Sequence, residues 1–341
     1  MLYSLIRSCL FTLNPDTAHQ LTLNTLQWAH RLKLVGLIPK PIQNPLIVMG
    51  ITFPNPVGLA AGYDRNGEYI DALSALGFGF IEIGTVVPMP QVGNQKPRLF
   101  RFPKQQALIN RVGFASLGVD YVIQQLKKMQ YSGVLGINIG KNKNTPNDQA
   151  IQDYLLGFNK LAPYASYITI NISSPNTQGL RDLQAREPLQ ALVQALKKAQ
   201  HHFFQTHQKY VPLVIKIAPD LNDTEISTIA DIILKQQVDG LIATNTTLTR
   251  PGLTAVKNAQ ETGGLSGKPL EELSTEVIQK FHHLLQHHVP IIASGGVIDQ
   301  VAAEKKLAAG ATLVQLYTGL IYQGPSLIRR IASSLKFTQG T

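Results

Sequence analysis

The sequence has a single cysteine and no long apolar run. Cys9 alone excludes an internal disulfide and a thiolate metal cluster, which favours a reducing compartment and a role for Cys9 as a small apolar residue in a helix. No segment approaches the roughly 18 apolar residues that a membrane-spanning helix needs. The first residues, MLYSLIRSCLFTL, are interrupted by Arg7 and lack a small-residue cleavage site. We therefore expect neither a spanning helix nor secretion.

Acidic residues are also scarce, and the chain carries a net charge of +10. The 31 Lys and Arg residues against 21 Asp and Glu favour anionic partners, such as nucleic acid, anionic lipid or acidic metabolites. The basic residues are scattered rather than clustered with aromatic residues, so we expect no nucleic-acid partner. A hydrophobic content of 44% in 341 residues is typical of one large or two ordinary globular domains.

Eight β-rich runs alternate with helical stretches along the chain. They are NPVGLAAG near 57, FIEIGT at 80, VLGINIG at 134, YITINIS at 167, PLVIKIAPD at 212, GLIATNT at 240, PIIASGG at 290 and LVQLYTG at 313. Strands that are apolar on both faces and alternate with helices are typical of parallel βα units. Eight such units predict an α/β fold, a closed (β/α)8 TIM barrel. A doubly wound open sheet is disfavoured, because no G-x-G-x-x-G opens a helix after the first strand.

Nearly all of these runs end in small or polar residues rather than in more Val or Ile. The clearest example is NISSPNT at 171–177, which directly follows the apolar YITI. One such ending is explained by ordinary turn chemistry, but eight at the carboxyl ends of barrel strands predict the rim of an active site. The glycines and hydroxyls of ASGGV and YTG, after the last two strands, predict a phosphate site.

Lys216 lies within the apolar strand VIKIAP, where an ammonium is costly to bury without an anionic partner. We expect it to face the mouth of the barrel and to neutralise a negative charge there. A salt bridge to the acid of a neighbouring strand, Glu82, is the structural alternative.

Two segments lie outside the regular repeat. Residues 86–114 form a long predicted loop, a candidate lid or binding element. Before the first strand, apolar residues at helical spacing predict two amphipathic helices, with Asn14 as a cap before Pro15. KPIQNP at 40–45 is the predicted linker, so residues 1–40 form one unit and residues 41–341 the barrel.

Other kinds of site are not expected. The HHLLQHH stretch has His283 and His287 four residues apart but lacks the Glu of H-E-x-x-H, so a solvated helix face is favoured over a metal site. No Ser-His-Asp arrangement is indicated, because neither Ser173 nor Ser174 has a histidine candidate on the rim.

Eleven motifs in chain order resemble those of the dihydroorotate dehydrogenase family. They are AAGYDRNG, EIGTV, PRLFR, NRVGF, GINIGKN, NISSPNT, VKIAPD, ATNTT, GGLSG, SGGV and YTG, and they run through most of the chain to about residue 330. The N-terminal helix pair and a serine at 174, where the soluble class carries a cysteine base, resemble the membrane-associated, quinone-reducing class 2 enzymes. The resemblance implies oxidation of (S)-dihydroorotate to orotate in de novo pyrimidine (UMP) biosynthesis, with FMN as hydride acceptor and a quinone as final acceptor.

The resemblance also implies roles for individual residues. Ser174 is the implied base for the C5 proton, with Thr177 and Phe114 as candidates for the surroundings that activate it. Lys216 would neutralise negative charge on the flavin. The implied substrate contacts are Arg65, Asn110, Arg111, Val112, Gly113, Phe114, Asn171, Asn176, Asn245 and Thr246. The implied FMN contacts are Ala61, Gly62, Tyr63, Asp64, Arg65, Thr85, Asn138, Asn171, Lys216, Thr244, Gly267, Gly296, Tyr317 and Thr318.

Arg65 departs from the family pattern, in which lysine is usual at this position. Arginine keeps the charge but carries a wider planar fork, so the exchange is not neutral. In the family the helix pair forms a membrane-facing tunnel, which implies that His19 and Arg101 line the quinone path. An anionic lipid surface and a peripheral location on the cytoplasmic face of the inner membrane follow from the same resemblance, helped by the basic residues Arg7, Arg31, Lys33 and Lys40.

Two other functions and one structural alternative remain open from the residues alone. The barrel also suits an isomerase or aldolase in which Lys216 forms a Schiff base. The second function is that of a non-enzymatic module that binds membranes through the helix pair. The structural alternative is that the helix pair only covers one end of the barrel.

Overall fold

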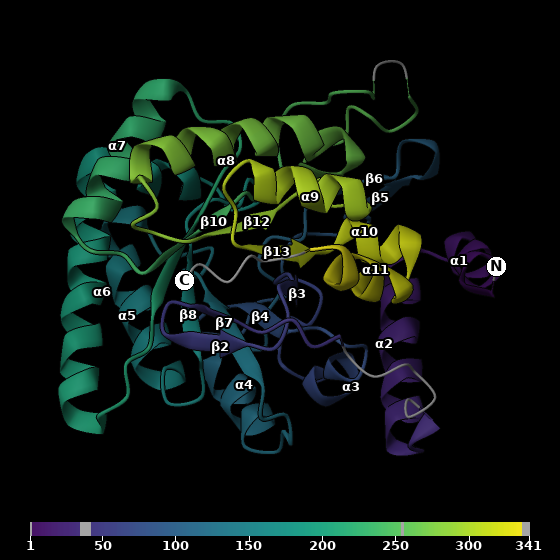
Figure 1. Cartoon of the computed structure of the whole chain (residues 1–341), viewed down its shortest axis with the longest axis horizontal. Helices are drawn as coiled ribbons and strands as arrows, with labels where there is room; N and C mark the ends of the chain where they lie inside the picture. The colour runs from purple at the N-terminus through teal and green to yellow at the C-terminus, as the bar shows by residue number, and fades with distance from the viewer. Residues whose placement is uncertain (1, 35–41, 254–255, 336–341) are drawn as a thin grey trace.

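The computed structural model describes residues 2–34, 42–253 and 256–335, and its centre is a closed barrel of eight parallel strands (Figure 1). Around the barrel the strand order is β10, β12, β13, β3, β4, β7, β8 and β9. Their bounds are β3 Val57–Leu59, β4 Phe80–Val86, β7 Val134–Ile139, β8 Tyr167–Asn171, β9 Leu213–Ile217, β10 Gly240–Ala243, β12 Ile291–Ser294 and β13 Leu313–Leu316. Each strand coincides with one of the eight predicted runs, β4 extending one residue beyond its run, and the prediction of a TIM barrel is confirmed.

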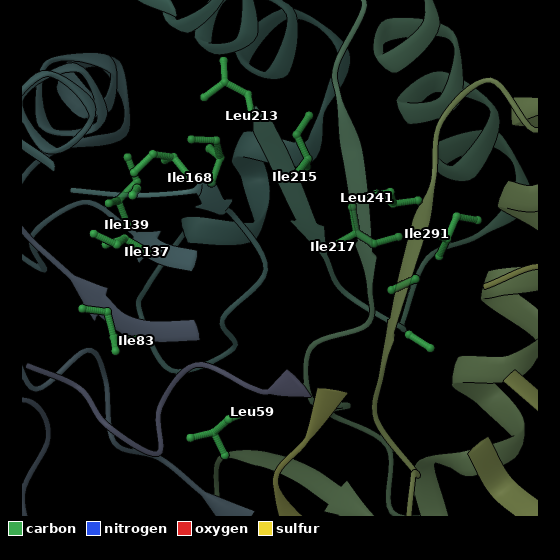
Figure 2. Close-up of a cluster of buried hydrophobic side chains, with 14 of the residues drawn as sticks. Leu59, Ile83, Ile137, Ile139, Ile168, Leu213, Ile215, Ile217, Leu241 and Ile291 are labelled. Carbon is green, nitrogen blue, oxygen red and sulfur yellow. The ribbon is translucent and has the colours of Figure 1, made fainter. Parts of the chain in front are cut away.

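Helices follow the strands and cover the outside of the barrel (Figure 1). They are α3 Ile70–Ser74, α4 Val119–Leu126, α5 Ala150–Leu161, α6 Arg186–His207, α7 Asp223–Lys235, α8 Glu271–Leu285, α9 Gln300–Ala308, α10 Thr318–Gln323 and α11 Ser326–Ser334. Their apolar faces meet the outward side chains of the strands, and Figure 2 shows ten labelled members of this layer, among them Ile83, Ile137, Ile215 and Leu241. This shared layer of branched aliphatic residues fixes the strand ends on which the site is built.

The other end of the barrel is closed by apolar side chains. A two-stranded hairpin, β1 Leu46–Val48 and β2 Ile51–Phe53, packs Val48 and Phe53 against interior residues such as Phe80, Tyr167 and Ile292. The rings of Phe53 and Phe80 meet edge to face, with their centroids 5.2 Å apart. This plug fills the amino-terminal end of the barrel, which leaves the carboxyl ends of the strands for the site.

The long loop predicted over residues 86–114, a candidate lid or binding element, is in part regular structure. This segment contains β5 Leu99–Phe102, a 3-10 turn at Pro103–Gln105 and β6 Ala107–Asn110. They form an antiparallel sheet with β11 Gly264–Gly267, in the order β11, β6, β5. The strand pattern was missed because β6 pairs with a partner some 150 residues away, which local periodicity does not reveal.

The predicted helix pair is present as α1 Leu2–Thr12 and α2 Pro15–Arg31 (purple in Figure 1). Asn14 caps α2 as predicted, because its side-chain oxygen accepts a hydrogen bond of 3.0 Å from the backbone N–H of Asp16. The pair docks on the barrel through an ion pair between Arg98 and Asp16 (3.2 Å) and a hydrogen bond from Arg7 to the carbonyl of Tyr322 (2.6 Å). Part of the predicted linker at 40–45, and the boundary between residues 40 and 41, lie outside the described residues.

The helix pair also presents apolar side chains to solvent. Leu5, Trp28 and Leu32 are 66%, 62% and 65% exposed, and Ile6 and Leu21 are exposed as well. None of the helices in the described part of the chain combines the length and the apolarity that crossing a bilayer requires.

Candidate active site

A cavity opens at the carboxyl ends of the barrel strands. Its wall is built from the ends of most barrel strands, from β6 and β11, and from α2 through His19. Predicted residues in the wall are His19, Ala61, Gly62, Arg65, Thr85, Asn110, Val112, Gly113, Phe114, Asn171, Ser174, Asn176, Lys216, Thr244, Asn245, Thr246, Gly267, Gly296, Tyr317 and Thr318. The fold therefore brings together residues that lie up to about 300 positions apart in the sequence.

The floor of the cavity depends on Glu82, a fully buried carboxylate on β4. It accepts hydrogen bonds from Asn138 (2.9 Å), Tyr167 (3.0 Å), Thr169 (3.1 Å) and Gln315 (2.8 Å), which belong to three other strands. A buried carboxylate with several donors is well solvated by the protein itself.

The hydrogen bond to Glu82 orients the Asn138 side chain, which in turn positions two residues of the cavity wall. Its Nδ2 donates to Glu82, so its Oδ1 is free to accept hydrogen bonds from Thr85 (2.6 Å) and from Asn171 (3.1 Å). Thr85 and Asn171 line the cavity, whereas Asn138 lies behind them. Asn138 thus positions two wall residues and does not itself form the wall.

Lys216 lies in the cavity wall and is 6% exposed. The alternative prediction, a salt bridge between Lys216 and Glu82, is wrong. Within the described residues the Lys216 ammonium forms no ion pair and no hydrogen bond. Burial lowers the pKa of Lys216, and the negative charge of Glu82 opposes that shift. A buried ammonium without a partner needs an anionic ligand from the cavity.

The loops after β12 and β13 supply backbone donors to the same cavity. In the described part of the chain, the backbone N–H groups of Gly295, Gly296, Thr318 and Gly319 have no hydrogen-bond acceptor, and all four residues line the wall. Gly296 has a φ of +75°, and a Cβ placed there would lie 2.3 Å from the Cα of Glu271. Four free backbone N–H groups that face one cavity are a donor set suited to binding phosphate. The close packing of Gly296 against Glu271 allows only glycine at this position.

Ser174 is 6% exposed, and its Oγ accepts a hydrogen bond of 3.3 Å from the backbone N–H of Asn176. Nearby in the sequence, the Thr177 hydroxyl is buried and is without a partner among the described residues. Phe114 lines the same cavity and is largely buried. The hydroxyl of Ser174 is therefore largely shielded from solvent.

Four asparagine side chains provide amide groups around the wall. Asn176 donates to Asn110 (3.1 Å), and Asn245 donates to Asn171 (3.3 Å) and to Ser173 (3.0 Å). Each amide retains donors or acceptors that can face the cavity. Such a ring of amides suits a planar ligand with alternating N–H and C=O groups.

Three more predicted contacts lie outside the main cavity wall. Tyr63 packs edge to face on His19 and Tyr317, with centroid distances of 5.2 and 5.6 Å. The Asp64 carboxylate accepts backbone N–H groups of Gly67 (2.9 Å) and Tyr69 (2.7 Å), which orders the loop that carries Arg65. Arg111 forms an ion pair of 2.5 Å with Glu261 at a neighbouring groove.

Some wall residues were not predicted. Gln315 and Ser294 contribute side chains, and Ser266 lies in GGLSG, a motif that was quoted without a role for the serine. Gln315 interrupts the apolar strand LVQL, which is a usable signal because a polar residue inside a buried strand needs a partner.

A second cavity lies between the helix pair and the barrel. It is lined by apolar side chains such as Ile6, Leu10 and Phe11, and Arg101 lies in its wall. Arg101 donates to the backbone carbonyls of Phe11 and Leu13 (both 3.1 Å), at the end of α1. The two cavities share His19, Leu99, Asn110, Ser266 and Tyr317, so they are adjacent.

Comparison with known proteins identifies this arrangement. Residues 46–338 match the sequence profile of the family described as dihydroorotate dehydrogenase. The chain belongs to the dihydroorotate dehydrogenase family.

Its similarity to dihydroorotate dehydrogenases extends over nearly the full chain. A Nitrosospira multiformis protein named dihydroorotate dehydrogenase (quinone) is 54% identical over 98% of this chain and 96% of its own length. One of the same name from Idiomarina loihiensis is 55% identical over 98% of this chain and 100% of its own. A crystal structure of the Eimeria tenella dehydrogenase in complex with ferulenol superposes with a TM-score of 0.85, at 39% identity, over 94% of this chain and 90% of that one. The resemblance inferred from the motifs is confirmed.

His19 predicts a pH dependence of stability. Burial, and then the charge of Arg65, lower its pKa from 6.5 to about 4. Below pH 6.5 the His19 imidazole becomes protonated in the unfolded chain but stays neutral in the folded chain. The free energy of unfolding therefore decreases as pH falls from 6.5 to 4, by about 3 kcal/mol at most. His19→Gln should remove this loss, measured as the difference in urea-unfolding free energy between variant and parent from pH 4.5 to 7.5. His202→Gln, at an exposed histidine, is the control, and equal pH slopes for parent and His19→Gln would exclude a neutral buried His19.

Proposed function

We propose that the protein oxidises (S)-dihydroorotate to orotate in de novo pyrimidine biosynthesis, with FMN as the immediate acceptor and a membrane quinone as the final one. The observation that carries this proposal is the coexistence, in one cavity, of an unpaired buried ammonium, free backbone donors for a phosphate and a shielded Ser174 hydroxyl. The quinone-dependent relatives support the choice of acceptor.

The residues of the cavity fit FMN. The free N–H groups of Gly295, Gly296, Thr318 and Gly319 would hold its phosphate, and the Lys216 ammonium would compensate charge on its ring system. Bound FMN supplies a two-electron acceptor for a hydride. We assign the wall residues Ala61, Gly62, Arg65, Thr85, Asn171, Thr244, Gly267 and Tyr317 to the same site, with Tyr63, Asp64 and Asn138 supporting it from behind.

Ser174 and the asparagines would act on the substrate. Asn110, Asn171, Asn176 and Asn245 can bind the amide edges of the dihydroorotate ring, joined by Val112, Gly113, Phe114 and Thr246 of the wall. The Oγ of Ser174 takes the proton from C5 as the hydride leaves C6, which forms the ring double bond. Ser174 is a weak base in water, and exclusion of solvent favours its task.

Thr177 and the two arginines would complete this substrate site. The unpaired Thr177 hydroxyl would relay this proton, accepting one from Ser174 while giving up its own toward solvent. Arg65 lines the cavity as a cation for the substrate carboxylate, and Arg111 borders the groove beside it.

The quinone would reach the inner cavity through the second cavity, between the helix pair and the barrel. The second cavity is apolar, joins the first at His19 and Tyr317, and contains Arg101. The exposed Leu5, Trp28 and Leu32 suit insertion at a membrane interface, and nearby basic residues attract anionic lipid. We assign residues 1–40 to quinone access at the cytoplasmic face of the inner membrane, and residues 41–341 to the catalytic barrel.

A flavin spectrum tests this function against its rivals. Protein purified in mild detergent should be yellow and should lose its absorbance near 450 nm when dihydroorotate is added without air, because the flavin is reduced. An aldolase using Lys216 would instead be trapped by borohydride with a carbonyl substrate. A folded, colourless preparation that stays colourless with added FMN would contradict the proposal.

Replacement of Ser174 should separate binding from chemistry. Ser174→Ala should keep FMN and bind dihydroorotate normally, while anaerobic flavin reduction slows by at least about 100-fold, the loss typical of a general base. Ser174→Cys is the rescue variant, since a thiol ionises near pH 8.5 and should restore reduction with a shifted pH profile. Unchanged single-turnover reduction in Ser174→Ala would remove this residue from the mechanism.

The exposed face of the helix pair should be required for lipid binding and not for flavin reduction. Changing Leu5 and Leu21 to Asp places charge on that face, so vesicle binding and turnover of a long-chain quinone should fall while reduction of FMN by dihydroorotate stays near normal. Phe204→Asp, on an exposed site of α6, is the matched control. Deletion of residues 1–40 should have the same effect on quinone turnover. If the Leu5 and Leu21 variant binds vesicles as well as the parent, the helix pair only covers the barrel.

A further inference from the structure

Lys306, on α9, is a fully buried lysine that the proposed chemistry does not use. Burial lowers the pKa of its ammonium to about 7. Its ammonium donates to the carbonyl of Glu271 (2.7 Å), to the hydroxyl of Ser274 (2.5 Å) and to the hydroxyl of Thr275 (2.7 Å). All three acceptors belong to the start of α8. None is a carboxylate, and across the described ranges no ion pair within 4 Å involves Lys306.

The position is electrostatically unfavourable for a cation on its own. The amino-terminal end of a helix carries partial positive charge, and burial adds the cost of desolvation. Glu271 is the nearest acid, but its carboxylate pairs with the exposed Lys305 at 2.8 Å, while Glu272 and Asp299 are further charged groups around this helix junction. An additional anion nearby would compensate the buried charge, and the cavity lies on the other side of this helix start.

Ser274 connects Lys306 to the cavity wall. Its Oγ accepts a hydrogen bond from the Lys306 ammonium, and its hydroxyl lies within donating distance of the carbonyls of Gly295 (3.0 Å) and Leu270 (2.8 Å). Gly295, Gly296 and Leu270 all line the cavity. Gly296 also packs directly on Glu271, where a Cβ would be 2.6 Å from the backbone N. The first turn of α8, held by Lys306, is therefore the support on which the Gly295–Gly296 donors rest.

We propose that Lys306 is a positioning residue for the phosphate of the bound cofactor. It fixes the first turn of α8 and, through Ser274, holds the Gly295 carbonyl toward the helix, which leaves the N–H groups of Gly295 and Gly296 to the phosphate. In its protonated form Lys306 also adds to the positive potential behind them. This inference rests on the proposed function, because it requires a phosphorylated flavin in the cavity.

The test compares a phosphorylated and an unphosphorylated flavin on the full-length protein. Flavin-depleted parent and Lys306→Met are titrated with FMN and with riboflavin, and binding is followed by quenching of flavin fluorescence. Lys306→Met should bind FMN about tenfold more weakly or worse, because the Gly295 and Gly296 donors lose their support, and should bind riboflavin as the parent does. Lys305→Met removes the same charge from the neighbouring exposed position and should change FMN binding less than twofold.

The outcomes separate the two proposals. Equal weakening for FMN and riboflavin, or no weakening at all, overturns the role of Lys306. Failure of the parent to bind FMN overturns the proposed function instead. If Lys306→Met does not fold, Ser274→Ala breaks the same connection while the ammonium stays. It should weaken FMN severalfold and leave riboflavin binding unchanged, and any other pattern overturns the inference.

Discussion

The hydrogen bonds that converge on Glu82 are the constraint on which the site depends. Four donors from β7, β8 and β13 satisfy this buried carboxylate, so it needs no lysine to compensate it. Lys216 is therefore left with an unpaired charge at the cavity wall. Removing one partner of the Glu82 cluster would leave a buried acceptor unsatisfied, which ties the stability of the barrel to the arrangement of the site.

The two ends of the barrel divide stability and chemistry between them. At the closed end, Phe53, Phe80 and Tyr167 pack with aliphatic residues and form an apolar plug. Toward the open end, β7, β8 and β9 carry Asn138, Asn171 and Lys216 at their last or second-last position. Because the plug and the outer layer of helices hold the strands, polar side chains at their ends keep their geometry without packing of their own.

The barrel and most of the cavity wall were predictable, because the signals for both lie within short stretches of the sequence. Runs such as VLGINIG combine buried strand and polar end within seven residues, and their order alone predicts the barrel. The β5–β6–β11 sheet was not predictable, since its pairing joins distant segments. Neither was Lys306, because EKKLAAG is typical of a solvated helix end and only packing shows which lysine is buried. The freedom of Lys216 from Glu82 likewise depends on side-chain directions in three dimensions.

The link between the two cavities has a mechanical basis as well as a chemical one. Arg101 holds the last carbonyls of α1, where a cation is favoured by the helix dipole, and it lies on β5. β5 pairs with β6, and β6 pairs with β11, which carries Ser266 and Gly267 of the inner cavity. The helix pair is thus connected to the wall of the inner cavity by a continuous small sheet. A displacement of α1 would therefore reach the wall of the inner cavity through the backbone hydrogen bonds of this sheet.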